Sequence, residues 1–83
     1  MEFEEVLEIV KSENGAKIAR KGWNDKRIYV FKAHAEDLTN CLSKDREFKC
    51  TDSLCLKTAQ DTITIGWTPS QADMFAEDWE IIK

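Results

Sequence analysis

The first strong pattern in the chain is a set of apolar residues that recur every three or four positions, namely Phe3, Val6, Leu7 and Val10. Positions at this spacing share one face of an α-helix, so a helix is predicted over about residues 3–12. Glutamates in its first turn suit the positive end of the helix dipole, and Asn14-Gly15 tolerates the left-handed conformation that ends a helix. This helix is expected to pack its apolar stripe against another element.

Short apolar or alternating runs predict β-strands at residues 16–20, 28–31, 54–58, 62–65 and 79–82. Gln60-Asp61 joins the third run to the fourth and predicts an antiparallel hairpin, although this pair is not a favoured two-residue turn. The second run is apolar on both faces, so both faces are expected to be covered. One helix cannot cover both. Part of this strand is therefore expected in a subunit interface, unless Tyr29 lies at an exposed edge.

The remaining segments carry weaker patterns. Residues 35–42 allow one or two helical turns, and the charged run over residues 43–47 is typical of an exposed loop. Pro69 suits the first position of a helical turn reaching Phe75, with Thr68 as its expected cap. Together the elements predict a single domain over residues 1–83 of the α+β class. It has a small antiparallel β-sheet of four to five strands, with the N-terminal helix packed on it.

The chain is short for an independently stable domain. A protein of this size buries only about 60% of its unfolded surface. The 83 residues nevertheless include three Trp, four Phe and one Tyr, a large apolar content for so small a volume. Such chains usually need a disulfide, a metal or further subunits to stabilise the core. We therefore expect a homo-oligomer.

Charge narrows the range of partners. Twelve basic and sixteen acidic residues give a net charge of −4. This balance argues against nonspecific binding to nucleic acid, which neutralises phosphates with Lys and Arg. A local phosphate pocket stays open, because four basic residues surround Trp23 in the sequence, namely Arg20, Lys21, Lys26 and Arg27. The alternative is a solvated charged surface.

Localisation follows from what the sequence lacks. It has no apolar run of about eighteen residues, so no membrane span is predicted. Its acidic start, Met1 to Glu5, lacks the positive flank of a secretory signal. A cytoplasmic protein with reduced cysteines is therefore expected.

The cysteines and the single histidine form a possible zinc set of His34, Cys41, Cys50 and Cys55. Zinc accepts three thiolates and one imidazole, but its ligands usually come in close pairs. Here six, eight and four residues separate successive candidates. We therefore predict no metal site and three free thiols, with Cys55 buried in a strand.

Catalytic chemistry is hard to assemble from this sequence. His34 has no obvious nucleophile near it, and no glycine-rich phosphate loop or Cys-His pair is present. Asp73, Glu77 and Asp78 offer a general acid and base, but carboxylates in such a segment also serve as capping or solvated groups. No catalytic residue and no cofactor are predicted.

Binding chemistry is easier to assemble. Trp23 and Trp67 each follow a glycine, which lets a ligand approach the backbone closely. A flat ring that stacks on an aromatic face gains roughly 1–3 kcal/mol. Polar side chains that can read its edge lie within a few residues: Asn24, Thr68, Ser70, Gln71 and Asp73. The alternative is that the tryptophans are core residues, and Trp79 is expected in the core in either case.

Two motifs carry a resemblance to a known family. The run from Arg20 to Asn24, followed by the runs from Trp67 to Met74 and from Glu77 to Glu80, resembles the second Thoeris anti-defence family of bacteriophages. The N-terminal helix also fits the family's usual opening. The resemblance covers about residues 1–32 and 54–83.

The resemblance implies a phage protein that acts in the cytoplasm of the infected bacterial host. Such a protein binds and sequesters glycocyclic ADP-ribose, a cyclic ADP-ribose isomer made by a TIR-domain enzyme, and does not cleave it. The downstream NADase effector then stays inactive. The family also implies a homotetramer, a dimer of dimers, with pockets between subunits, and some members hold cyclic dinucleotides at separate sites.

At the matching positions, the resemblance makes Trp23 and Trp67 the stacking residues and Arg20 the phosphate partner. The hydrogen-bonding candidates are Asn24, Thr68, Ser70, Gln71 and Asp73. Residues 33–53 depart from the family pattern, so an ADP-ribose conjugate or a cyclic dinucleotide stays open as the ligand. A nucleotide hydrolase and a structural oligomer without a ligand also stay open.

Overall fold

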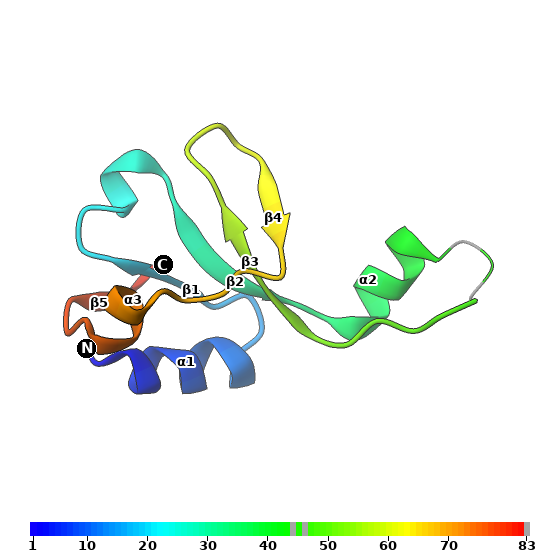
Figure 1. Cartoon of the computed structure of the whole chain (residues 1–83), viewed down its shortest axis with the longest axis horizontal. Helices are drawn as coiled ribbons and strands as arrows, with labels where there is room; N and C mark the ends of the chain where they lie inside the picture. The colour runs from blue at the N-terminus through cyan, green and yellow to red at the C-terminus, as the bar shows by residue number, and fades with distance from the viewer. Residues whose placement is uncertain (44, 46, 83) are drawn as a thin grey trace.

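Five strands form one antiparallel sheet in the order β4-β3-β2-β1-β5 (Figure 1). The computed structural model describes residues 1–43, 45 and 47–82, without the side chain of Asn24. The strands are β1 (Lys17–Arg20), β2 (Tyr29–Ala33), β3 (Ser53–Lys57), β4 (Ile63–Ile65) and β5 (Trp79–Ile82). The last strand pairs with the first and forms one edge of the sheet. The predicted α+β class and the β3–β4 hairpin are confirmed.

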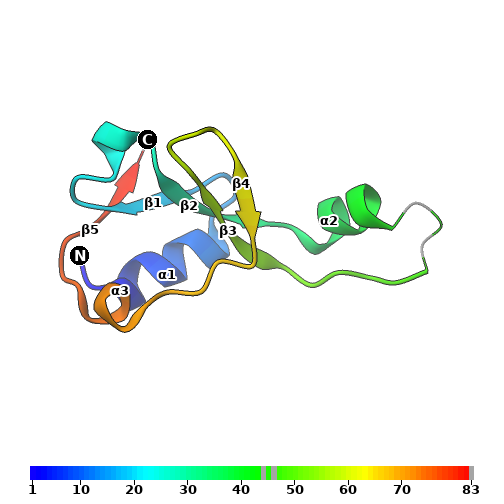
Figure 2. The same cartoon turned by 45° about the horizontal axis from the view of Figure 1, so that its top comes forward.

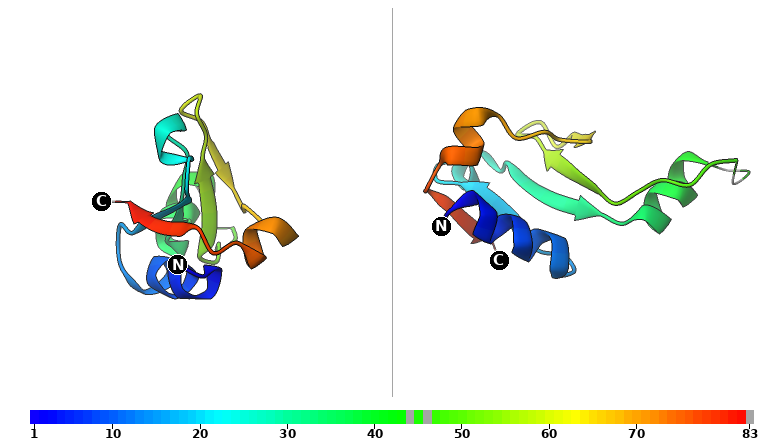
Figure 3. Two further views of the ribbon diagram at one scale, coloured as in Figure 1. Left: turned by 90° about the vertical axis from the view of Figure 1, so that its left-hand side faces the viewer. Right: turned by 60° about the horizontal axis from the view of Figure 1, so that its bottom comes forward.

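Helices α1 (Phe3–Ser12) and α3 (Gln71–Phe75) lie on the same face of the sheet (Figures 2 and 3). Helix α1 begins and ends where its apolar spacing predicts. Its buried residues Phe3, Val6 and Val10 pack against Ile18, Val30 and Trp79 to form the core. The hydrophobic core therefore lies between α1 and the three strands β2, β1 and β5.

The strand register separates two faces of the sheet. One row across all five strands consists of Thr64, Leu56, Val30, Ile18 and Ile81 and faces the helices. The neighbouring row on the opposite face consists of Ile65, Cys55, Phe31, Lys17 and Ile82. Cys55 is buried in β3, as predicted. No helix of the described chain covers this second face (Figure 3).

Strands β2 and β3 continue beyond the sheet into an arm that carries α2 (Ala35–Leu42) (Figure 1). The arm accounts for the elongated shape of 42 × 26 × 25 Å. The carboxylate of Asp52 accepts a hydrogen bond of 2.8 Å from the Ala35 N–H and so caps the start of α2. The loop predicted over residues 43–47 includes Lys44 and Arg46, which lie outside the described residues.

One predicted helix cap was wrong. Helix α3 is capped by Ser70, two residues after the expected Thr68. The Ser70 hydroxyl accepts the Asp73 N–H at 3.1 Å, and the Asp73 carboxylate accepts the Ser70 N–H at 3.0 Å. This reciprocal capping box satisfies two backbone donors that a cap at Thr68 would leave unpaired.

Candidate functional site

The three tryptophans gather at one end of the core. Trp79 is only 2% exposed and is a core residue, as predicted. The rings of Trp23 and Trp67 meet it edge to face, at centroid distances of 5.4 and 6.3 Å. Phe3 of α1 packs on the same ring at 5.3 Å. Trp23 and Trp67 thus share a buried aromatic support while each remains half-buried.

Local backbone geometry places Trp67 on the helix-bearing face of the sheet. Gly66 has a φ of +84°, which a residue with a Cβ rarely adopts. The N–H groups of Gly66 and Trp67 both donate to the Leu54 carbonyl, at 3.0 and 2.8 Å. The chain therefore turns directly off β4, crosses β3 and continues towards α3.

A second turn places Trp23 between β1 and β2. Gly22 has a φ of +91°, and the Trp23 carbonyl accepts the N–H groups of Lys26 and Ile28 at 3.0 and 3.1 Å. These bonds form the short 3₁₀ turn over Asn24–Lys26. The Asn24 side chain, a predicted hydrogen-bonding group, lies outside the described part of the chain.

Arg20 joins the two tryptophan segments through an internal network. Its Nε donates to Asp78 at 3.0 Å, and its Nη1 donates to Asp73 at 3.2 Å. The Asp73 carbonyl in turn accepts the indole N–H of Trp79 at 2.8 Å. Asp73 therefore bonds to two other predicted site residues, Arg20 and Ser70, and to the core residue Trp79.

The network sets the charges of its members. The hydrogen bond to Asp78 raises the pKa of Arg20. Burial acts to lower this pKa, but its effect is smaller. Burial acts to raise the pKa of Asp73, but hydrogen bonds from Ser70 and Arg20 together leave that pKa below its usual value of 3.8. Asp73 is thus a carboxylate at neutral pH, which suits an ion pair and does not suit a general acid.

The other predicted polar residues lie at the surface. Thr68 and Gln71 are exposed on either side of the α3 cap; Thr68 directly follows Trp67, and Gln71 is the first residue of α3. Trp67, Thr68 and Gln71 therefore combine one half-buried ring with exposed polar groups in a single segment. That arrangement can stack a flat molecule and hydrogen-bond to its edge.

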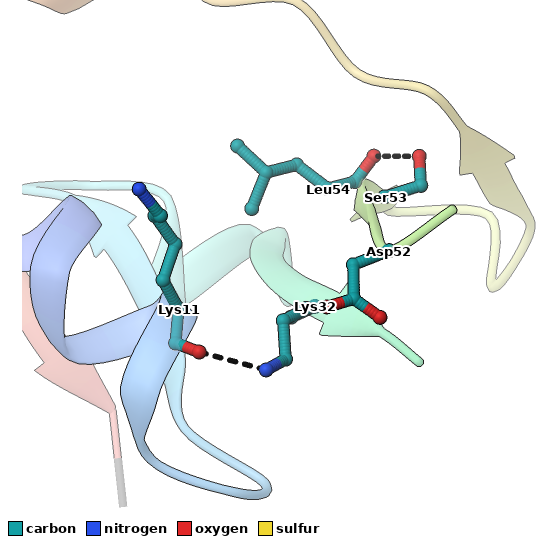
Figure 4. A pocket seen from close by; sticks show the side chains of 5 residues that line it. All are labelled: Lys11, Lys32, Asp52, Ser53 and Leu54. Carbon is teal, nitrogen blue, oxygen red and sulfur yellow. Dashed lines mark hydrogen bonds between the residues drawn. The ribbon is translucent and has the colours of Figure 1, made fainter. Parts of the chain in front are cut away.

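A hollow of about 240 Å³ was missed from the sequence (Figure 4). It lies between the C-terminal end of α1 and strands β2 and β3, and it is lined by Lys11, Lys32, Asp52, Ser53 and Leu54. One feature of the sequence could have indicated this hollow. Lys32 follows Val30 by two positions and so lies on the helix-facing side of β2, where an apolar residue is usual.

The described residues show neither a cluster of metal ligands nor a membrane-spanning helix. Within residues 1–43, 45 and 47–82, no three His, Cys, Asp or Glu side chains are grouped to hold a metal ion. None of the described helices has the length and apolar character needed to cross a bilayer. Cys41, Cys50 and Cys55 are free thiols.

The fold and site define a small single-sheet α+β domain with a candidate binding surface built around tryptophans. A family model described as the Thoeris anti-defense 2-like domain matches residues 1–82, so the chain belongs to this family. The chain is also similar to Thoeris anti-defense 2 of Bacillus phage SP01. The two are 33% identical over 88 residues, which span all of this chain and 96% of the phage protein. The predicted family is confirmed, and the match includes the arm.

Proposed function

We propose that this protein is a phage counter-defence protein that binds and sequesters a nucleotide immune signal of the cyclic ADP-ribose type, namely glycocyclic ADP-ribose. The observation that carries the proposal is the family match along residues 1–82. By holding the signal in the cytoplasm of the infected bacterial host, the protein keeps the Thoeris NADase effector inactive.

The surface at Trp67 supplies suitable binding chemistry. The Trp67 ring is half-buried against Trp79, so its orientation is fixed before a ligand arrives. Stacking of one base on such a ring contributes roughly 1–3 kcal/mol. Thr68 and Gln71 supply exposed hydrogen-bonding groups for the base or ribose, and Trp23 offers a second ring. Arg20, Ser70 and Asp73 hold these segments in place.

Sequestration fits the carboxylates better than hydrolysis does. Asp73 and Asp78 both accept hydrogen bonds from Arg20. A general acid must hold a proton near the working pH, whereas the pKa of Asp73 is lowered. We therefore propose that the protein is not an enzyme and releases its ligand unchanged.

We also propose that the protein works as a homotetramer built as a dimer of dimers. The sheet face opposite α1 carries Phe31 and Ile82, which are half-buried, and Ile63 and Ile65, each 50% exposed. Lys17 also lies on this face, but an exposed apolar patch of this kind suits contact with a second copy. A stable interface buries about 800 Å² per partner, and this face crosses all five strands. This contact supplies the cover predicted for β2.

Calorimetric titration with glycocyclic ADP-ribose, an ADP-ribose conjugate and a cyclic dinucleotide tests the binding proposal. Trp67→Ala should weaken binding of the preferred ligand about 5- to 150-fold, since stacking is worth roughly 1–3 kcal/mol. Phe48→Ala is the matched control, because it removes a 50% exposed aromatic ring from the arm. A folded wild-type oligomer that binds none of these nucleotides would contradict the proposal and favour a purely structural role.

A further inference from the structure

The guanidinium of Arg20 is poorly placed to bind phosphate. Its Nε and Nη1 already donate to Asp78 and Asp73, and both carboxylates would repel an approaching anion. If the proposed nucleotide binds beside Trp67, its phosphates need another cationic partner. Rupture of the Arg20 network would also disturb the cap of α3.

The hollow at the end of α1 contains two such cations. The Lys32 ammonium donates to the Lys11 carbonyl at 2.7 Å, which leaves two further N–H donors on the same nitrogen. The Lys11 side chain extends from α1 past the end of the Leu54 side chain, and its ammonium points away from the Lys32 ammonium (Figure 4). Neither ammonium forms an ion pair with any residue that the structure describes. Both charges are therefore available to an anion.

The hollow shares Leu54 with the Trp67 segment. Leu54 lines it, and the Leu54 carbonyl accepts the N–H groups of Gly66 and Trp67. Leu54 and Trp67 also pack against the same hydrophobic core. A ligand whose base stacks on Trp67 can thus extend over Leu54 towards the two lysines.

The size and charge of the hollow fit part of a nucleotide. Its volume of about 240 Å³ lies below the range of roughly 300–1,000 Å³ for complete small-molecule sites. It therefore suits the phosphates and one sugar. Asp52 lines the hollow too, and its Oδ1 accepts the Ala35 N–H at 2.8 Å. Its negative charge would repel a phosphate placed next to it, so the phosphates are assigned to the lysines. The carboxylate is suited to ribose hydroxyls, while the lysines attract the phosphates.

From these observations we infer that Lys11 and Lys32 bind the pyrophosphate of the nucleotide that the proposed function assigns to the Trp67 surface. The inference rests on that proposed function and specifies which end of the site recognises charge. In this assignment Lys11 and Lys32, rather than Arg20, bind the phosphates.

The test compares ligands with and without phosphate. Wild type, Lys11→Gln and Lys32→Gln are titrated with glycocyclic ADP-ribose and with adenosine, at low and moderate salt. Each substitution should weaken the phosphate-bearing ligand about tenfold, the effect of losing one charge-assisted contact. Adenosine binding should not change, and the salt dependence of nucleotide binding should decrease. Lys49→Gln is the control, because it removes an exposed charge from the arm.

The outcomes separate the two proposals. Equal nucleotide affinity in wild type, Lys11→Gln and Lys32→Gln, with binding lost in Trp67→Ala, would overturn only the pyrophosphate assignment. Absence of any nucleotide binding by wild type would overturn the proposed function and this inference with it. Lys32 also caps α1, so its variant is checked by thermal unfolding. Lys11→Gln keeps the carbonyl that accepts this bond and provides an independent test.

Discussion

Asp73 offers the sharpest test of which residues hold the site together and which touch the ligand. Its carboxylate is 13% exposed, accepts the Ser70 N–H at 3.0 Å and pairs with Arg20 at 3.2 Å. Asp73→Ala removes both interactions. Asp73→Asn keeps an oxygen for Ser70 and removes only the charge. The two substitutions therefore separate the cap from the ion pair.

The expected losses follow from these contacts. Loss of the hydrogen bond from the Ser70 N–H to the Asp73 carboxylate costs about 1 kcal/mol, while the Ser70 hydroxyl still caps α3. Loss of the ion pair costs up to about 1 kcal/mol, because the Arg20 side chain is 28% exposed and solvent screens the pair. Asp73→Ala should thus destabilise the fold by about 1–2 kcal/mol and lower the melting temperature by roughly 5–15 °C. Asp73→Asn should cost about half as much.

Thermal unfolding followed by circular dichroism gives the melting temperatures, at one fixed protein concentration because an oligomer's stability depends on concentration. Ligand affinity is then measured well below each transition, where all variants are folded. We expect Asp73→Asn to bind the nucleotide within a few-fold of wild type. A wild-type melting temperature for Asp73→Ala, combined with lost binding, would refute a bracing role and make Asp73 a ligand contact.

Three further predictions follow from the same structure. The pKa of Asp73 is lowered in the folded protein, so its ionised form stabilises the fold. This stabilisation is complete at pH values above 3.8, the usual pKa of the carboxyl group. The melting-temperature difference between wild type and Asp73→Asn should therefore stay constant from neutral pH to about pH 5 and shrink as pH falls through the folded pKa. A difference that grew in acid would contradict the lowered pKa of Asp73. Gly66→Ala should cost about 1–2 kcal/mol from its φ of +84° alone, because an added Cβ meets no atom within 4 Å; a loss above about 4 kcal/mol would indicate a clash. Ile65→Glu should dissociate the oligomer in sedimentation experiments while Thr62→Glu, at the exposed hairpin turn, leaves it intact; an unchanged mass for Ile65→Glu would remove this face from the interface.

Local elements could be predicted from the sequence because their signals are local. The apolar spacing of α1 and the apolar run of β5 depend on neighbours a few residues away, and both elements lie where expected. The cap at Ser70 was also readable in principle, since Asp73 follows it by three residues and completes a capping box. Thr68 has the same capping chemistry, and the choice of the earlier residue was wrong.

Longer-range features of the site could not be predicted in this way. Arg20 meets Asp73 and Asp78 because β5 pairs with β1 in a register that sets Arg20 opposite Trp79. The sequence contains no local signal for that register. A basic residue beside Trp23 therefore looked free for phosphate. The lysine hollow likewise forms only when the end of α1 lies over β2 and β3.

The central claim is that the protein holds a nucleotide signal without changing it. The most direct measurement incubates the protein with glycocyclic ADP-ribose, heat-denatures the mixture and determines the small molecule by mass spectrometry and by activation of the Thoeris NADase. The account predicts that free signal disappears before heating and that the full amount of intact, active signal returns afterwards. Return of a cleaved product, or no recovery of active signal, would contradict sequestration and favour a hydrolase.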